Sequence, residues 1–276
     1  MTKAQVGGAM KLSGGTSIPQ VGLGVWKIPP GDATRNAVSA ALASGYRHID
    51  TAAAYGNEAD VGAAIRDSGI PRDEIFVTTK LWNADQGYEP ALRAFDASAK
   101  RLGLDYVDLY LVHWPVPGKR LDSWRALEQI AKDGRTRAIG VSNFLTDHLQ
   151  ELLKVAELPP AVNQIELHPF LQRRDTVAFC HSHNILIEAY SPLTHAIRLT
   201  DPAIISIAQD VRRTPAQVLL RWSLQQGNVV LPKSTNPKRI AENIALFDFK
   251  LEDDQVAKLT ALDEAFATCW DPADVE

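Results

Sequence analysis

Cysteine, long apolar runs and excess positive charge are all scarce in this sequence. Only two cysteines, Cys180 and Cys269, occur among 276 residues, which is too few for a disulfide framework and fits a reducing compartment. No apolar run approaches the roughly 18 to 20 residues of a membrane span, and the opening MTKAQVGGAMKLSGG has no apolar signal-peptide core. A formal net charge of -4 argues against general nucleic-acid binding, which needs a basic surface. We therefore expect a cytoplasmic protein without membrane or nucleic-acid partners.

The chain also lacks Pro/Gly/Ser-rich linkers and low-complexity tracts, which predicts a single domain over residues 1–276. Short β-branched runs alternate with amphipathic helical stretches, at intervals of roughly 25–40 residues, as a (β/α)8 barrel requires. Most of these runs are apolar on both faces, which is typical of parallel strands covered on both sides. The predicted strands are residues 21–26, 46–50, 75–80, 107–114, 137–143, 161–168, 185–190 and 228–234.

The predicted fold is thus an α/β protein, a (β/α)8 TIM barrel with a short N-terminal β-hairpin and extra C-terminal helices. Gly14 and Gly15 form the predicted hairpin turn, and the hairpin could plug the bottom of the barrel. A helix is expected over 32–44, and the extra helices over 236–246 and 253–262. The architectural alternative, a doubly wound sheet, requires a glycine-rich phosphate turn, and GLGVWK does not match it.

Polar side chains end several of the predicted strands, and in a barrel these ends face the active site. Asp50, Lys80 and His113 close consecutive runs and would converge on one cavity, where burial leaves each charge in need of a partner. Each residue alone has an ordinary structural explanation, such as capping a helix or facing solvent. The joint pattern favours a catalytic site.

This group of residues has a specific chemical interpretation. Asp50 and Lys80 are expected to form an ion pair, with the phenol of Tyr55 lying against the Lys80 ammonium. A nearby cation favours phenolate, so the pKa of Tyr55 is expected to fall from its ordinary value of about 10. The phenol could then donate a proton near neutral pH while His113 orients a carbonyl group. Taken alone, Tyr55 would be interpreted as a surface loop tyrosine.

A second candidate site is the basic stretch LPKSTNPKRIAEN. Asn236 is expected to cap a helix, and Pro237 suits its first turn. Cationic side chains beside free backbone N–H groups form an anion site, here suited to a phosphate monoester. The alternative is a solvated basic turn.

Six segments, HIDTAAAYGNE, TTKLW, DLYLVHWP, IGVSNF, NQIELHP and PKSTNPKRIAENI, resemble the aldo-keto reductase family in order and spacing across nearly the whole chain. Within the family, the chain looks most like bacterial reductases of the 2,5-diketo-gluconate reductase and morphine dehydrogenase type. The resemblance implies a barrel that binds NADPH (NADP+) in extended form without a Rossmann domain.

The resemblance also implies roles for individual residues. The implied catalytic tetrad is Asp50, Tyr55, Lys80 and His113, with Tyr55 as general acid in reduction and as base in the reverse reaction. The implied nicotinamide contacts are Ser142, Asn143, Gln164 and Tyr190. The other implied cofactor residues are Ser191 and Leu193 near the pyrophosphate, Lys233, Ser234, Thr235 and Arg239 at the 2′-phosphate, and Glu242 and Asn243 at the adenine. The implied pocket residues are Trp26, Trp82, Trp114 and Trp270.

One departure from the family pattern affects the cofactor contacts. The family commonly follows the tripeptide SPL with glycine, which lets backbone approach a pyrophosphate closely, whereas here Leu193 is followed by Thr194 and His195. The pyrophosphate contact is therefore expected to differ in detail. The loops after Trp114 and Leu193 are short, which predicts an open cofactor channel and a shallow pocket.

The expected activity is NADPH-dependent reduction of aldehydes or ketones (keto-sugars, α-dicarbonyls or similar compounds) to alcohols, by a monomer acting on a small carbonyl substrate. The alternative is a non-catalytic cofactor-binding or structural protein on the same fold. GVSNF lacks the last glycine of a hydrolase elbow. Cys180, His181 and His183 fall in a helical stretch without a fourth ligand at usual spacing, so no metal site is expected.

Overall fold

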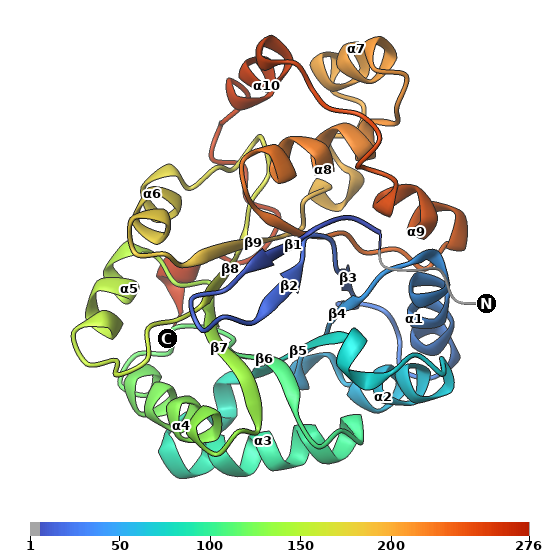
Figure 1. Cartoon of the computed structure of the whole chain (residues 1–276). Coiled ribbons are helices and arrows are strands. Elements are labelled where there is room, and N and C mark those ends of the chain that lie inside the picture. The colour runs from blue at the N-terminus through green and yellow to red at the C-terminus, as the bar shows by residue number, and fades with distance from the viewer. Residues whose placement is uncertain (1–5, 276) are drawn as a thin grey trace.

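Eight parallel strands form a nearly closed barrel surrounded by helices (Figure 1). The computed structural model describes residues 6–275, so residues 1–5 and 276 of the predicted domain lie outside it. The strand order is β10-β9-β8-β7-β6-β5-β4-β3. A parallel bridge between Val21 and Val230, with the amide of Gly22 donating to the carbonyl of Val230 (2.9 Å), joins the two edges. The barrel prediction is therefore confirmed, and the doubly wound alternative is excluded.

Most strands are shorter than the apolar runs that predicted them, but two keep the predicted length and are shifted by one residue, 76–81 for the predicted 75–80 and 136–142 for the predicted 137–143. The barrel strands are β3 (Leu23–Gly24), β4 (His48–Asp50), β5 (Phe76–Leu81), β6 (Val107–Val112), β7 (Thr136–Ser142), β8 (Val162–Glu166), β9 (Leu186–Tyr190) and β10 (Val229–Leu231). The helices are α1 (Asp32–Ser44), α2 (Glu58–Asp67), α3 (Tyr88–Leu102), α4 (Arg120–Lys132), α5 (Thr146–Leu153), α6 (Arg174–Ser182), α7 (Pro202–Asp210), α8 (Pro215–Gln225), α9 (Pro237–Ile244) and α10 (Asp253–Thr260).

The predicted hairpin is present and closes one end of the barrel. Strands β1 (Ala9–Lys11) and β2 (Ser17–Pro19) pair antiparallel and cross the middle of the barrel in Figure 1. Leu12 and Ile18 are buried in one apolar cluster with Phe76, Val162 and Val229, the first residues of β5, β8 and β10. The hairpin therefore covers the amino-terminal ends of the strands, opposite the predicted site.

Helix packing follows the apolar pattern of the sequence. Helix α1 spans the predicted 32–44, and its apolar stripe of Ala37, Val38, Ala41 and Leu42 is buried. Helix α2 approaches the end of α3 closely at Gly62, where an added Cβ would lie 1.8 Å from the carbonyl oxygen of Leu102. Only glycine fits at this contact.

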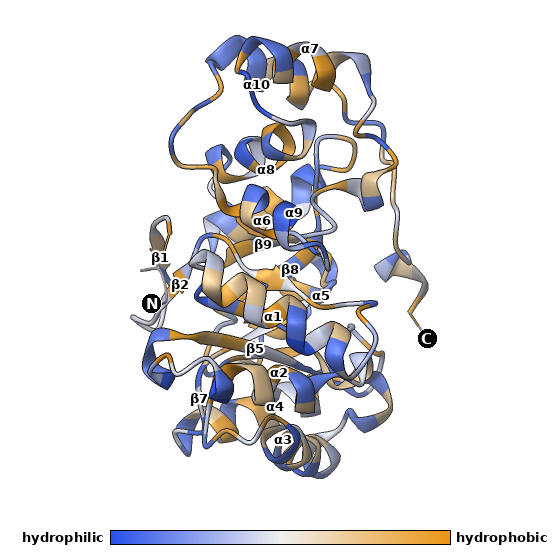
Figure 2. Ribbon diagram, turned by 90° about the vertical axis from the view of Figure 1, so that its right-hand side faces the viewer, coloured by the Kyte–Doolittle hydropathy of each residue, from blue (hydrophilic) through white to orange (hydrophobic). Residues whose placement is uncertain are grey.

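The carboxyl-terminal part of the chain contains the predicted extra helices as α9 and α10. Beyond α10, the chain runs along the barrel to the end opposite the hairpin (Figure 2). Within residues 6–275, none of the helices combines the length and the apolar character needed to cross a bilayer.

Candidate active site

The structure brings Asp50, Tyr55 and Lys80 into direct contact at the carboxyl ends of β4 and β5. The fully buried Lys80 Nζ donates to Asp50 Oδ1 at 2.7 Å, to the carbonyl oxygen of Thr51 at 2.9 Å and to the phenolic oxygen of Tyr55 at 3.2 Å. The predicted ion pair is present. A short 3-10 turn, Ala53–Tyr55, carries the phenol back over the strand ends. Since Lys80 donates to the phenolic oxygen, the phenolic hydrogen is free to point elsewhere.

The predicted fall in the pKa of Tyr55 is wrong for this structure. Burial raises the pKa of the phenol more than the Lys80 ammonium lowers it, and the charge of Asp50 adds to the rise. Burial alone would lower the pKa of Lys80, but Asp50 and Tyr55 outweigh it and raise the value. At neutral pH the site therefore contains a charged ammonium beside a protonated phenol.

His113 lies beside the phenol and stays neutral. Its ring centroid is 5.7 Å from that of Tyr55 in an edge-on arrangement and 5.3 Å from that of Trp82. Burial, with a smaller contribution from Lys80, places the pKa of His113 well below its ordinary value. A neutral imidazole carries one N–H group, which can donate to a carbonyl oxygen.

Gln164 extends the network deeper into the barrel. Its Nε2 donates to Asp50 Oδ2 at 2.8 Å and to Glu188 Oε2 at 2.7 Å. Glu188 was not predicted as a site residue, because it lies inside an apolar run. The available signal was its spacing, since a residue two before Tyr190 in a strand points to the same side.

The residues predicted to hold a nicotinamide form a second hydrogen-bonded group beside the first. Asn143 Nδ2 donates to the carbonyl oxygen of His113 at 3.0 Å, and the Tyr190 hydroxyl donates to Asn143 Oδ1 at 2.7 Å. Ser142 Oγ donates to the carbonyl oxygen of Gln164 at 2.9 Å. Asn143 has a φ of 63°, which turns the chain out of β7. The carboxamide and stacking roles of these residues stay predictions.

The predicted phosphate site is a helix start surrounded by free cations. Asn236 caps α9 as predicted, with its Oδ1 accepting from the amides of Lys238 and Arg239 at 2.9 and 3.2 Å. Lys233, Lys238 and Arg239 are exposed, and none of their side chains forms an ion pair or hydrogen bond within residues 6–275. These two amides already donate to Asn236, so the three exposed cations are the groups that could bind a phosphate here.

The neighbouring residues predicted at the 2′-phosphate and adenine vary in their environment. Thr235 is exposed, whereas Ser234 is buried and its Oγ accepts from the amide of Asn236 at 3.1 Å. Glu242 Oε1 accepts from Thr214 Oγ1 at 2.8 Å, and Asn243 is buried. Their contacts with a cofactor stay predictions.

Three of the four predicted pocket tryptophans form a continuous group with His113. Trp82 and Trp114 both contact its ring, and Trp114 lies 6.0 Å from the mostly exposed Trp270. Trp26 instead lies beside His195, with ring centroids 5.7 Å apart.

Glu166 fastens the carboxyl-terminal segment across the strand ends. Its buried carboxylate accepts from the amide of Thr268 at 2.7 Å and from the amide of Cys269 at 3.1 Å, and also from the Thr268 hydroxyl. Burial works against ionisation, but hydrogen bonds from His168 and Thr268 hold the pKa of Glu166 below its ordinary value. This carboxylate contact, between residues far apart in the sequence, keeps Trp270 next to Trp114.

The segment that departs from the family pattern has an unusual backbone. Ser191, Thr194, His195 and Ala196 have φ values of 47°, 50°, 51° and 68°, in the left-handed region that favours glycine. Each costs about 1–2 kcal/mol for a residue with a side chain. The absent glycine therefore has a structural consequence. Leu193 and Ser191 lie in this strained turn, where their pyrophosphate contact stays a prediction.

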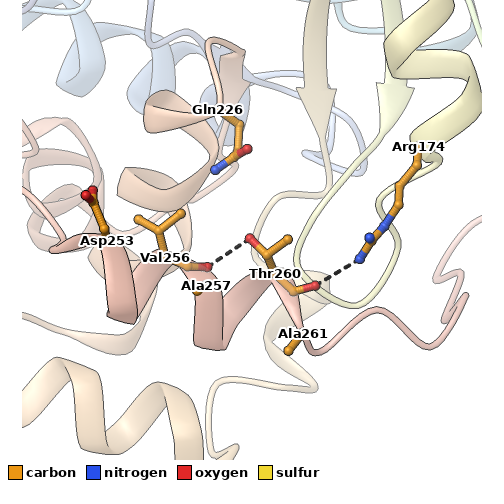
Figure 3. A pocket seen from close by; sticks show the side chains of 7 residues that line it. All are labelled: Arg174, Gln226, Asp253, Val256, Ala257, Thr260 and Ala261. Atoms are coloured by element: carbon orange, nitrogen blue, oxygen red, sulfur yellow. Dashed lines mark hydrogen bonds between the residues drawn. The ribbon is translucent and has the colours of Figure 1, made fainter.

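A separate groove of about 490 Å³ lies on the outside of the barrel, between α10 and Arg174 (Figure 3). Arg174 Nη2 donates to the carbonyl oxygen of Thr260 at 3.1 Å on its rim. This groove contains none of the predicted site residues, so the network around Lys80 remains the candidate active site.

Comparison with known proteins identifies the relatives of this chain. It is 53% identical over 254 residues to an aldo-keto reductase of Mycolicibacterium smegmatis, covering 91% of this chain and 92% of that protein. It is 49% identical to glyoxal reductase of Bacillus subtilis (92% of each chain) and 49% identical to morphine 6-dehydrogenase of Pseudomonas putida (97% and 95%).

A solved structure and a family model also match this chain. The crystal structure of a mutant of Gox0644 in complex with NADPH superposes with a TM-score of 0.93 at 43% identity, covering 99% of this chain and 100% of that one. The model of the aldo/keto reductase family matches residues 8–264. The chain therefore belongs to the aldo/keto reductase family.

Proposed function

We propose that this protein reduces aldehydes or ketones to alcohols with NADPH. The observation that carries the proposal is the contact of one buried ammonium, Lys80 Nζ, with both Asp50 and Tyr55. The names of the relatives, which include a glyoxal reductase and a morphine dehydrogenase, support a carbonyl or alcohol substrate. We further propose that the chain acts as a single-domain, cytoplasmic monomer.

The residues present fit NADPH. Three exposed cations at the capped start of α9 suit its 2′-phosphate, and Ser142, Asn143, Gln164 and Tyr190 offer an amide- and ring-binding surface beside the phenol. When bound, NADPH supplies a hydride to a carbonyl carbon. The chain's own groups must bind the carbonyl oxygen and deliver the proton.

Tyr55 is the proposed proton donor. Lys80 donates to its oxygen, which leaves the phenolic hydrogen available to a carbonyl oxygen and stabilises the phenolate that remains. The raised pKa of the phenol keeps this hydrogen in place at neutral pH. When the proton is transferred, the positive charge of the Lys80 ammonium stabilises the phenolate that forms. In alcohol oxidation the phenolate would act as the base.

His113 and the aromatic walls are proposed to position the substrate. The neutral imidazole donates a hydrogen bond to the carbonyl oxygen without bringing a competing charge. Trp82, Trp114 and Trp270 exclude water and select by shape more than by charge. The proposed substrates are keto-sugars, α-dicarbonyls or similar activated carbonyl compounds.

The test combines cofactor binding with turnover. NADPH binding is measured by fluorescence titration, and consumption of the reduced cofactor is followed with methylglyoxal, keto-sugars, aromatic aldehydes and alicyclic ketones. Tyr55→Phe should lose turnover by about a hundredfold or more and bind NADPH as the wild type does. Comparable turnover in this variant would overturn the proton-donor assignment. Binding without turnover in the wild type would favour the non-catalytic alternative.

A further inference from the structure

A second carboxyl group, that of Glu188, is linked to Asp50 through the side chain of Gln164. Glu188 is fully buried in the middle of β9, where its register partners are Gln164 on β8 and Val229 on β10. Its Oε2 accepts from Gln164 Nε2 at 2.7 Å, and its Oε1 lies 3.4 Å from His48 Nε2. The tetrad mechanism makes no use of this group.

The charges around Glu188 leave it without a cation of its own. Lys80 is already paired with Asp50 at 2.7 Å, and burial lowers the pKa of His48 to about 3, so that ring is neutral. Burial, and then the charge of Asp50, raise the pKa of Glu188 to about 8. The carboxyl is therefore protonated at neutral pH, with His48 Nε2 near its Oε1.

The hydrogen bonds of Gln164 then determine the direction of its amide. A primary amide has two N–H donors and one carbonyl oxygen. Both donors of Gln164 are used, one on Asp50 Oδ2 and one on Glu188 Oε2. The oxygen Oε1 is left for an incoming donor, such as the amide group of a nicotinamide.

We propose that Glu188 is a positioning residue that fixes the amide of Gln164 for the cofactor through the hydrogen bond from Gln164 Nε2 to its Oε2. As a neutral carboxyl, it also keeps a second negative charge out of the site. This inference rests on the proposed function, because it names the nicotinamide cofactor. Ionisation of Glu188 would place two carboxylates on one amide nitrogen. A nicotinamide ring is positive in NADP+ and neutral in NADPH, so the added charge would favour the oxidised form.

The experiment measures binding rather than turnover. The dissociation constants of NADP+ and NADPH are determined by titration calorimetry from about pH 6 to about pH 10, for the wild type, Glu188→Gln and Glu188→Leu. Both cofactors carry the same 2′-phosphate, so its titration cancels from their ratio. The amide in Glu188→Gln keeps the shape and the acceptor but cannot ionise, which makes it the matched control.

In the wild type, the affinity for NADP+ divided by the affinity for NADPH should be several-fold higher above about pH 8 than below it. In Glu188→Gln this ratio should not change with pH. Glu188→Leu should bind both cofactors about tenfold more weakly at all pH values, since one donor of Gln164 loses its acceptor. A ratio that changes equally in the wild type and Glu188→Gln would overturn the proposal, as would wild-type affinity in Glu188→Leu. If Glu188→Leu does not fold, the comparison with Glu188→Gln decides. Failure of the proposed function is distinguishable, because it would appear as absent binding or absent turnover in the wild type.

Discussion

Replacing Lys80 by methionine tests the buried ion pair directly through protein stability. Lys80 Nζ is fully buried and is the cation that pairs with Asp50. Removing one partner of a buried pair typically costs about 3–5 kcal/mol, because the remaining charge is left uncompensated. We expect Lys80→Met to lower the free energy of unfolding by about this amount near pH 8.

The loss should depend on pH in a direction that the structure fixes. Burial already raises the pKa of Asp50, and Lys80 is what opposes the rise. In Lys80→Met the folded-state pKa of Asp50 rises further above its unfolded value of about 3.9. A carboxyl group whose pKa is higher in the folded than in the unfolded state destabilises the fold only as the pH rises above its pKa in the unfolded state. The penalty of the variant relative to the wild type should therefore be smallest near pH 4, where Asp50 is protonated in both folded proteins. It should grow by about 1.4 kcal/mol per pH unit above the folded-state pKa of Asp50 in the wild type, until the higher folded-state pKa in the variant is reached.

The assay is urea unfolding followed by tryptophan fluorescence and circular dichroism at several pH values. The double variant Asp50→Asn/Lys80→Met is the matched control, since a neutral amide in place of the carboxylate needs no counter-ion and can still accept from Gln164. It should recover most of the loss near pH 8. A penalty for Lys80→Met below about 1 kcal/mol, or one that is constant with pH, would refute the reasoning. So would a double variant that is no more stable than the single one.

Three further predictions concern the phosphate site, the carboxyl-terminal segment and helix packing. Arg239→Ala should weaken NADPH binding about tenfold or more while changing NADH binding little, because only NADPH carries the 2′-phosphate; equal losses for the two cofactors would remove this site. Glu166→Gln should make the terminal segment more sensitive to limited proteolysis and raise KM for bulky ketones several-fold, since two backbone amides lose a charged acceptor. Trp270→Ala should change KM alone, and unchanged proteolysis in Glu166→Gln would contradict the role of Glu166 in holding the carboxyl-terminal segment. Gly62→Ala should cost about 1–3 kcal/mol in urea unfolding, whereas Gly14→Ala, which has open space around it, should be close to neutral.

The barrel and the contact between its strand ends could be predicted from sequence for a simple physical reason. Parallel strands in a barrel all point their carboxyl ends to one face, so Asp50 and Lys80 had to lie near each other once their runs were recognised as strands. Helix α1 matched its predicted bounds because glycines flank it: Gly31 lies before Asp32, and Gly45, with a φ of 101°, ends it.

Quantities that depend on a balance of opposing effects could not be predicted. The sequence indicates that a cation lies near Tyr55, but the direction of its pKa depends on how deeply the hydroxyl is buried, and burial prevails. Contacts between distant segments were equally out of reach. Nothing local to Glu166 indicates that it accepts from Thr268, a residue 102 positions away.

The hairpin at the amino-terminal end of the barrel has a kinetic consequence. Leu12 and Ile18 fill that end, and Figure 2 places the hairpin on the side opposite the carboxyl-terminal segment. We expect both ligands of the proposed function, the cofactor and the carbonyl compound, to reach Lys80 from the opposite end of the barrel. If one of them lies deeper than the other, their binding should be kinetically ordered.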